Sequence, residues 1–136
     1  MKKIVSLLCL CFTIAFCSAQ SLPADAAYFI NTFFPNNQIN GVAEYNDGSI
    51  VVQMDMDISI QFDNSGACLY VLSMHQDISH MVSDKIKNYL RENGDNPKNV
   101  VRIQYRWQDN KTRITLNDGA IFVFDASGNF LRKDQD

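Results

Sequence analysis

The chain has little cysteine beyond its N-terminal segment. Three of its four cysteines lie at or before Cys17, and only Cys68 follows. Once a signal segment is removed, no disulfide can form within the chain, so the core alone must hold the fold together. Cys68 comes shortly after Gly66 in an expected strand, which favours a small buried apolar side chain over a reactive thiol.

Long apolar runs are absent except at the N-terminus. Lys2 and Lys3 precede residues 4–17, an apolar run of signal-peptide length that is short for a membrane span. Cleavage after Ala19 would leave small residues at the last and third-last positions of the removed segment. The sequence therefore predicts a signal peptide over residues 1–19, export to the periplasm or outside, and no membrane span after its removal. A lipid-anchored cysteine stays an alternative, although Phe or Leu precedes Cys9, Cys11 and Cys17 where processing prefers a small residue.

The chain also lacks an excess of positive charge. Lysine and arginine total 12 against 15 acidic residues, a formal net charge of −3 that becomes −5 without Lys2 and Lys3. Nucleic acids and anionic membrane surfaces both call for a basic face. The sequence therefore predicts no nucleic-acid partner. It leaves the oligomeric state open.

One turn pattern occurs twice, each time between an alternating apolar run and a second short apolar run. In this pattern Asp accepts a backbone hydrogen bond two residues on, and Gly supplies a positive φ for a tight strand connection. The two copies are Phe62-Asp63-Asn64-Ser65-Gly66 and Phe124-Asp125-Ala126-Ser127-Gly128.

Each turn follows a helical pattern and a series of short strands. Helices are expected at residues 22–34 and 82–93, because apolar residues recur there at helical spacing. The expected strands are 39–45, 49–54, 58–62, 67–72, 100–108, 111–116, 120–124 and 129–132, and residues 133–136 are expected to form a solvated tail. The chain then reads as a signal peptide over residues 1–19 and one domain over 20–136. That domain holds two repeats, 22–72 and 82–132, joined by a linker at 73–81.

The order and doubling of these motifs resemble the PepSY-like, beta-lactamase-inhibitor-like (BLIP-like) family of exported bacterial proteins. In the first copy the residues that carry the resemblance are Leu22-Pro23, Phe29-Ile30, Phe34-Pro35, Ile39, Val42 and Phe62-Asp63 with Gly66. In the second copy they are Tyr89-Leu90, Val100, Ile103, Asp118-Gly119 and Phe124-Asp125 with Gly128. The copies differ in two loops, where Asn93-Gly94 replaces the aromatic-Pro helix end and Met56-Asp57 stands opposite Asp118-Gly119.

The resemblance implies an α+β fold, a duplicated helix plus four-stranded antiparallel sheet in a BLIP-like or PepSY-like tandem repeat. It also implies export and no known enzymatic activity. The inhibitor label reflects shape alone, and a shared fold does not establish a shared target.

The spacing of the candidate metal-binding and catalytic residues gives little support for either kind of site. His75, Asp77 and His80 match no common ligand pattern, which favours a solvated linker, although the role of the two histidines stays open. The sequence offers neither histidine a serine or cysteine nucleophile flanked by glycines, as nucleophilic catalysis would need. Asp55, Asp57 and Asp63 lack a regular calcium loop and are better explained as turn residues. The sequence predicts no metal, no cofactor and no enzymatic activity.

The strand expected at residues 100–108 offers the candidate partner surface. Alternation places Tyr105 and Trp107 on one face, and Arg102 and Arg106 on the other, with Arg113 on the next strand. Aromatic residues and arginine are typical protein-interface anchors. A simple core role for Tyr105 and Trp107 is the alternative. Ile121 and Val123 point opposite to Phe122 and Phe124, which further predicts that the last hairpin buries both of its faces, either against the other half or against a partner.

Two functions from different classes fit this sequence. The first is an exported non-enzymatic binding module that recognises an exported protein or peptide through its sheet face, as a beta-lactamase or peptidase inhibitor would. The second is a small-ligand-binding or envelope accessory protein that uses a cleft between the repeats. Surface aromatic residues on a flat sheet favour the first function, and aromatic residues that line a pocket favour the second.

Overall fold

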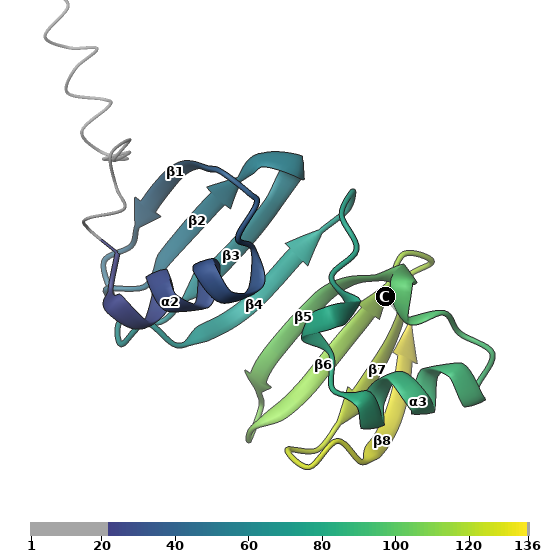
Figure 1. The fold of residues 1–136 in the computed structure, drawn as a ribbon. Helices are drawn as coiled ribbons and strands as arrows, with labels where there is room; N and C mark the ends of the chain where they lie inside the picture. Colours follow the sequence, from purple (N-terminus) through teal and green to yellow (C-terminus); the bar gives the residue numbers. More distant parts are fainter. Residues whose placement is uncertain (1–21, 136) are drawn as a thin grey trace, which may run out of the picture. The chain divides into compact units, whose positions relative to one another are not determined.

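The computed structural model of the protein describes residues 22–135 (Figure 1). The signal peptide predicted over residues 1–19 and its cleavage site after Ala19 lie outside the described residues. The chain divides between Cys68 and Leu69 into two compact units, and each is described by itself as the first and the second unit. The predicted division into repeats 22–72 and 82–132 stays a prediction.

The first unit begins with one helix, followed by the strands of two hairpins. Its elements are α2 (Ala24–Phe33), β1 (Ile39–Glu44), β2 (Ile50–Met54), the 3-10 turn η2 (Asp55–Asp57) and β3 (Ile58–Phe62). On α2 the predicted stripe buries Ala26 and Ile30, and Phe34 directly after the helix is 1% exposed. Pro35 cannot continue a helix, which explains the end of α2.

The sheet of the first unit follows the predicted alternation. Ile58, Ile60 and Phe62 of β3 are fully buried, and the residues between them are half-exposed. The register of β2 against β3 is unbroken, so Val52 lies opposite Ile60 in the core. The ring of Phe29 on α2 meets Phe62 edge-on at 5.5 Å, which packs helix and sheet together.

The second unit also combines one α-helix with 3-10 turns and strands, but it has more strands than the first unit. Its elements are β4 (Cys68–Ser73, from Leu69 on), η3 (Ser79–Met81), α3 (Asp84–Glu92), η4 (Pro97–Asn99), β5 (Val100–Trp107), β6 (Lys111–Leu116), β7 (Ala120–Phe124) and β8 (Phe130–Gln135). The helix α3 lies across one face of the strands of this unit (Figure 1).

Aromatic rings hold α3 on the sheet. Tyr89 stacks on Phe130 at 4.4 Å between centroids and meets Phe124 edge-on at 5.7 Å. Ile86 and Leu90 are the buried aliphatic residues of the helix. The helix begins two residues later than predicted, because Ser83 is its N-cap and accepts a 3.3 Å hydrogen bond from the Ile86 N–H.

All eight strands form one antiparallel sheet in the order β1-β2-β3-β4-β5-β6-β7-β8. The predicted fold class, a duplicated helix plus four-stranded sheet, is therefore wrong: the fold is mostly β, with two α-helices in residues 22–135. The strand expected to close the first repeat pairs with β5, where Val71 lies opposite Ile103. This pairing satisfies backbone N–H and C=O groups that two separate four-stranded sheets would leave at open edges.

The last two strands agree with the sequence reading only in part. All five residues of β7 are buried, but residues 131–133 of β8 are exposed, so the prediction that the last hairpin buries both faces holds for its first strand alone. Strand β8 runs to Gln135, with Lys133 opposite Phe122 and Asp134 opposite Ile121. The prediction of a tail at 133–136 was therefore wrong for the backbone, which pairs with β7 as far as Gln135, although the Lys133 side chain is exposed to solvent as predicted.

Candidate functional site

The strands of the second unit have one face that α3 covers and one that it does not. Ile103, Ile114 and Phe122 lie opposite one another on the face toward α3. On the other face, which we call the arginine face, cross-strand pairing produces two rows. One row is Tyr70, Gln104, Arg113, Val123 and Arg132, and the other is Leu72, Arg102, Thr115, Ile121 and Asp134.

The arginines of this face are held by their neighbours. The guanidinium carbon of Arg102 lies 5.1 Å from the centre of the Tyr70 ring, a cation–π contact. Arg113 Nη1 donates a 2.7 Å hydrogen bond to Gln104 Oε1. Arg132 Nε lies 3.2 Å from Asp134 Oδ2. Each guanidinium is therefore oriented before any partner arrives.

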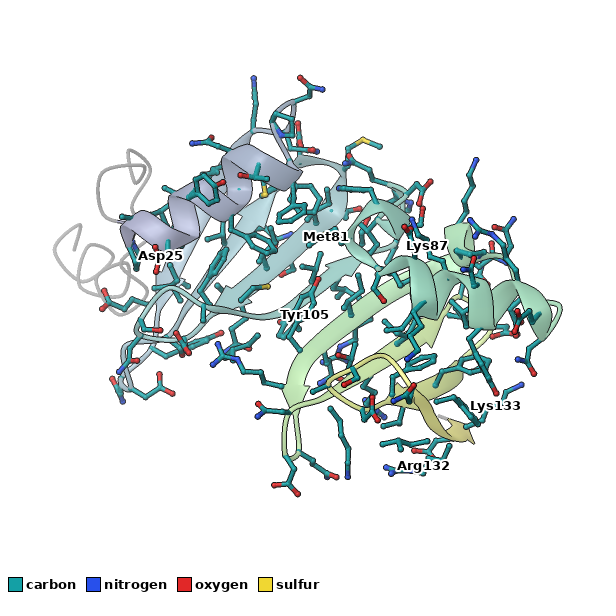
Figure 2. The ribbon with its side chains drawn as sticks, turned by 60° about the horizontal axis from the view of Figure 1, so that its bottom comes forward. Asp25, Met81, Lys87, Tyr105, Arg132 and Lys133 are labelled. Carbon is teal, nitrogen blue, oxygen red and sulfur yellow. The ribbon has the colours of Figure 1, made fainter. Side chains whose placement is uncertain are left out.

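The apolar centre of the arginine face lies beneath long side chains. Val123 is fully buried and lies between Arg113 and Arg132 in the register, and Ile121 is 2% exposed. Arginine covers apolar surface with its aliphatic stem while its charged end reaches water. Arg132 and Lys133 follow each other along β8, and the alternation puts only Arg132 on this face (Figure 2).

Two of the three other predicted surface residues, Arg106 and Trp107, lie where β5 departs from regular pairing. The register shifts between Gln104 and Trp107, and Trp107 pairs with Lys111 as the last residue of β5. Arg106 is exposed with a φ of 52°, in the left-handed region. The structure therefore brings Arg102 and Arg113 together on the arginine face and places Arg106 in the shifted part of the strand.

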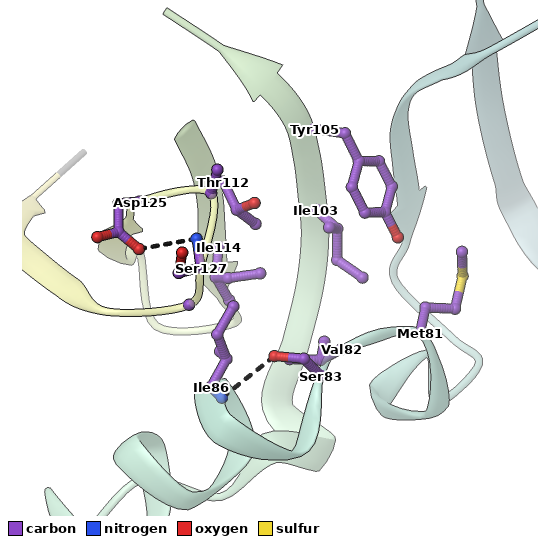
Figure 3. A pocket seen from close by; sticks show the side chains of 12 residues that line it. Met81, Val82, Ser83, Ile86, Ile103, Tyr105, Thr112, Ile114, Asp125 and Ser127 are labelled. Carbon is purple, nitrogen blue, oxygen red and sulfur yellow. Dashed lines mark hydrogen bonds between the residues drawn. The ribbon is translucent and has the colours of Figure 1, made fainter. Parts of the chain in front are cut away.

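Tyr105 lies on the opposite face of β5 and borders a cavity of about 210 Å³ beside the start of α3 (Figure 3). We call it the α3 cavity. Its apolar walls are Met81, Val82, Ile86, Ile103, Tyr105 and Ile114. Ser83, Thr112 and the turn of residues 125–128 complete it. The buried floor is aliphatic, since Ile103 and Ile114 are fully buried and Ile86 is 5% exposed.

The turn after β7 forms the polar side of the α3 cavity. Asp125 Oδ1 accepts hydrogen bonds from the N–H of Asn129 at 2.8 Å and of Ser127 at 2.9 Å. The hydrogen bonds from the Asn129 backbone and side chain, then that from Ser127 and the positive charge of Lys85, lower the pKa of the Asp125 carboxyl, although desolvation opposes them. Lys85 Nζ also donates to Asn129 Oδ1, so a cation lies close to this carboxylate.

Two of the aspartates weighed as metal ligands, Asp63 and Asp77, accept hydrogen bonds within turns. In residues 22–135, no three His, Cys, Asp or Glu side chains are grouped to hold a metal ion. Asp77 Oδ1 accepts a 2.8 Å hydrogen bond from the Ser79 N–H. Desolvation raises the pKa of Asp77, but the Ser79 hydrogen bonds and the charges of Lys98 and His80 outweigh it, so the pKa is lowered.

Sequence reasoning missed three residues of the α3 cavity. Ser83 carried a signal, because Ser followed by Asp84 before a helical pattern is typical of an N-cap. Met81 and Thr112 carried none, because their role depends on how η3 and β6 meet around the helix start. The cavity lies within the second unit.

No family model and no curated protein matches the chain. Among solved structures, the chain is similar to a DUF2874-family protein of Bacteroides vulgatus ATCC 8482 that is described as periplasmic. The two share 25% identity and a TM-score of 0.70 over 86% of this chain and 93% of that chain. A second protein of that organism, described as periplasmic and of unknown function, has 20% identity and a TM-score of 0.72 over 86% and 94%.

A third similar structure is a protein of Bacteroides thetaiotaomicron described as calcium-regulated and periplasmic, with 19% identity and a TM-score of 0.73 over 86% and 93% of the two chains. Together with the sequence of the N-terminus, these similarities confirm the prediction that the protein is exported to the periplasm or outside. Each helix in residues 22–135 is too short or too polar to cross a bilayer. The resemblance to the PepSY-like family stays a prediction.

Proposed function

We propose that the protein is an exported, non-enzymatic binding module whose arginine face recognises an acidic surface of another exported protein or peptide. The observation that carries this proposal is the charge of that face. Arg102, Arg113 and Arg132 contribute three positive charges against one negative charge from Asp134. The whole chain has the opposite sign, with a formal net charge of −3.

The composition of the arginine face supports recognition of a protein partner. Tyr70 and three arginines belong to the residue types enriched at interfaces. Guanidinium groups match carboxylates with two parallel hydrogen bonds, a geometry that lysine does not offer. The contacts with Tyr70 and Gln104 restrict Arg102 and Arg113 in advance, which lowers the entropy lost on binding.

Turn chemistry supports a non-enzymatic role. Among the carboxyls in residues 22–135, those of Asp47, Asp77 and Asp125 each have a lowered pKa. All three accept hydrogen bonds from residues two to four positions later in the chain. A catalytic acid at neutral pH needs a raised pKa, so we assign these carboxylates to the stabilisation of turns.

Site-specific photo-crosslinking in the exporting cell tests the proposal. A benzophenone amino acid at position 115 lies within the arginine face, and the same group at Tyr28, which is 73% exposed on α2, is the matched control. We expect position 115 to capture an acidic exported partner that position 28 does not capture. Equal capture from both positions, or capture only from position 28, would contradict the proposal.

Purified partner then allows a quantitative test. Arg113→Glu should weaken binding by about 1.5–3 kcal/mol or more, the range for a hydrogen bond to a charged group. The affinity should also fall with added salt. Lys87→Glu makes the same charge change on α3 and should leave binding unchanged. If both variants bind alike, the arginine face is not the contact.

The inhibitor class is tested separately by hydrolysis of a chromogenic beta-lactam. Unchanged rates of a purified beta-lactamase at micromolar concentrations of this protein would remove that class of target. Recognition of an acidic partner by the arginine face would stand, because it rests on charge and register.

A further inference from the structure

We propose that the α3 cavity is a binding site for a single uncharged aromatic ring, carried by a small molecule or by a side chain of a peptide. It lies on the side of the sheet opposite the arginine face, so it is a second site that extends beyond the proposed function. Figure 3 shows its walls coming from β5, β6, the start of α3 and the turn after β7.

The size of the cavity fits one ring. Its volume is about 210 Å³. An apolar cavity of about 150 Å³ is large enough to bind benzene. The α3 cavity therefore accommodates a six-membered ring together with a small substituent.

The chemistry of the walls fits the flat faces of a ring. Ile86, Ile103 and Ile114 form an aliphatic floor that remains buried. Met81 and Tyr105 are half-buried at the side of the cavity (Figures 2 and 3). Methionine sulfur makes favourable contacts with ring edges, and tyrosine prefers tilted or offset ring partners.

The polar side of the cavity disfavours a charged ligand. The Asp125 carboxylate keeps its negative charge because its pKa is lowered, so an anionic ring would be repelled. Its oxygens already accept three hydrogen bonds from Ser127 and Asn129, and Lys85 lies beside them, which reduces the attraction for a cation. The hydroxyls of Ser83, Thr112 and Ser127 are suited to an uncharged substituent such as a phenol hydroxyl.

Titration of the isotope-labelled protein, followed by NMR, tests this site. The probes are phenol and N-acetyltyrosinamide, with benzoate and benzylamine as the charged counterparts. We expect saturable shifts from both uncharged probes, with intermolecular contacts between the ring and the methyl groups of Ile86, Ile103 and Ile114. Tighter binding of N-acetyltyrosinamide would assign the ring to a peptide side chain, and tighter binding of phenol would assign it to a free small molecule.

A pair of variants on the same strand separates the cavity from the rest of the sheet. Thr112→Phe fills the cavity and should weaken binding of phenol by about tenfold or more, an effect of at least about 1.4 kcal/mol. Thr115→Phe places the same side chain on the arginine face and should leave phenol binding unchanged. Arg113→Glu should weaken binding of the arginine-face partner and leave phenol binding unchanged, whereas Thr112→Phe should do the reverse, so failure of one proposal is distinguishable from failure of the other.

Several outcomes would overturn the inference. They are the absence of saturable shifts at up to about 10 mM probe, tighter binding of benzoate or benzylamine than of phenol, and equal binding to wild type and Thr112→Phe. If Thr112→Phe does not fold, the contacts of the ring with the three isoleucine methyl groups in the wild-type protein decide the question, and contacts elsewhere contradict the site.

Discussion

In the turn at Asp63 in the first unit and the turn at Asp125 in the second, the aspartate carboxylate accepts the same two backbone hydrogen bonds. Asp63 Oδ1 accepts from the N–H of Ser65 at 2.9 Å and of Ala67 at 3.0 Å. Asp125 Oδ1 accepts from the N–H of Ser127 at 2.9 Å and of Asn129 at 2.8 Å. The local sequence therefore determines the turn in both places.

The two turns differ in how they meet the helix of their unit. A Cβ added to Gly66 would lie 3.1 Å from Asp25 Cβ, 3.2 Å from Pro23 Cβ and 3.3 Å from the backbone nitrogen of Ala26. A Cβ added to Gly128 would meet the side chain of Lys85, with Cδ at 3.3 Å. The first turn thus packs on the helix backbone itself, whereas the second touches a flexible stem beside the α3 cavity.

This difference teaches that one turn motif serves two purposes. In the first unit the turn closes the core against the start of α2. In the second unit it forms the wall of a space that the side chains of Ile103, Tyr105 and Ile114 leave beneath the start of α3. The binding surfaces that we propose both belong to the second unit, and the predictions below test that contrast.

The largest effect is expected from truncation of the phenylalanine that precedes each turn. Phe62→Ala and Phe124→Ala both empty a fully buried position, and each should lower the free energy of unfolding by about 3–5 kcal/mol. Phe62→Ala also loses one edge-on contact, with Phe29, and Phe124→Ala loses two, with Tyr89 and Phe130, which adds about 0.5–1.5 kcal/mol for each ring pair. Chemical denaturation followed by circular dichroism measures both losses, and a loss below about 1 kcal/mol at either position would contradict the packing described.

The next largest effect on stability is expected from replacing the glycine of each turn by alanine, and the loss should differ between the two turns. Both have a positive φ, 93° for Gly66 and 87° for Gly128, so alanine at either position costs about 1–2 kcal/mol. Gly66→Ala also presses on the backbone of α2, which adds about 1–3 kcal/mol. Melting curves of the two variants give the comparison, and an equal loss would show that both turns are packed alike.

A smaller effect is expected at the start of α3. Ser83→Ala removes the N-cap hydrogen bond to Ile86 and should cost about 1 kcal/mol. Ser83→Asp retains an acceptor and serves as the matched control. The helix α2 begins after Pro23 without a side-chain cap bond, so its stability is the reference within the same molecule. Amide hydrogen exchange resolves the two helices, and equal protection of α3 in both variants would rule out the cap.

The smallest effects concern the titration of one aspartate in each unit. The hydroxyl and N–H of Ser49 lower the pKa of Asp47, and the Asn129 backbone and side chain lower that of Asp125, from the ordinary value of 3.8. A lowered folded-state pKa stabilises the fold above pH 3.8, and this contribution is lost as the pH falls through the folded value. Carboxyl-carbon NMR titration should show Ser49→Ala raising the pKa of Asp47 alone and Asn129→Ala that of Asp125 alone. A shift of both by one variant would contradict the assignment.

Much of the secondary structure could be predicted from local pattern. The strands at 58–62, 111–116 and 120–124 have the predicted bounds, because alternation ends at a turn residue in each case. The pattern does not specify which strand lies beside which, and the pairing of β4 with β5 was therefore missed. The polar residues Lys133 and Asp134 were likewise assigned to a tail, because their polarity indicates exposure but does not indicate that their backbone pairs with β7.

Within the candidate site, the sequence predicts the face of a residue only where the residue lies in a regularly alternating strand. Arg102 and Arg113 occupy the face opposite Ile103 and Ile114, as period-two spacing requires. The position of Arg106 was not predictable, since the shift in register after Gln104 comes from the hairpin and not from the strand pattern. The α3 cavity depends on Met81 and Thr112, which are far apart in the sequence and carry no shared pattern.

The most direct test of the central claim is an NMR titration of the labelled protein with a short glutamate-rich peptide. The account predicts amide shifts at Gln104, Arg113, Val123 and Arg132 on the arginine face, weakened by added salt and by Arg113→Gln. Shifts confined to residues 22–67, or shifts that Arg113→Gln leaves unchanged, would contradict it.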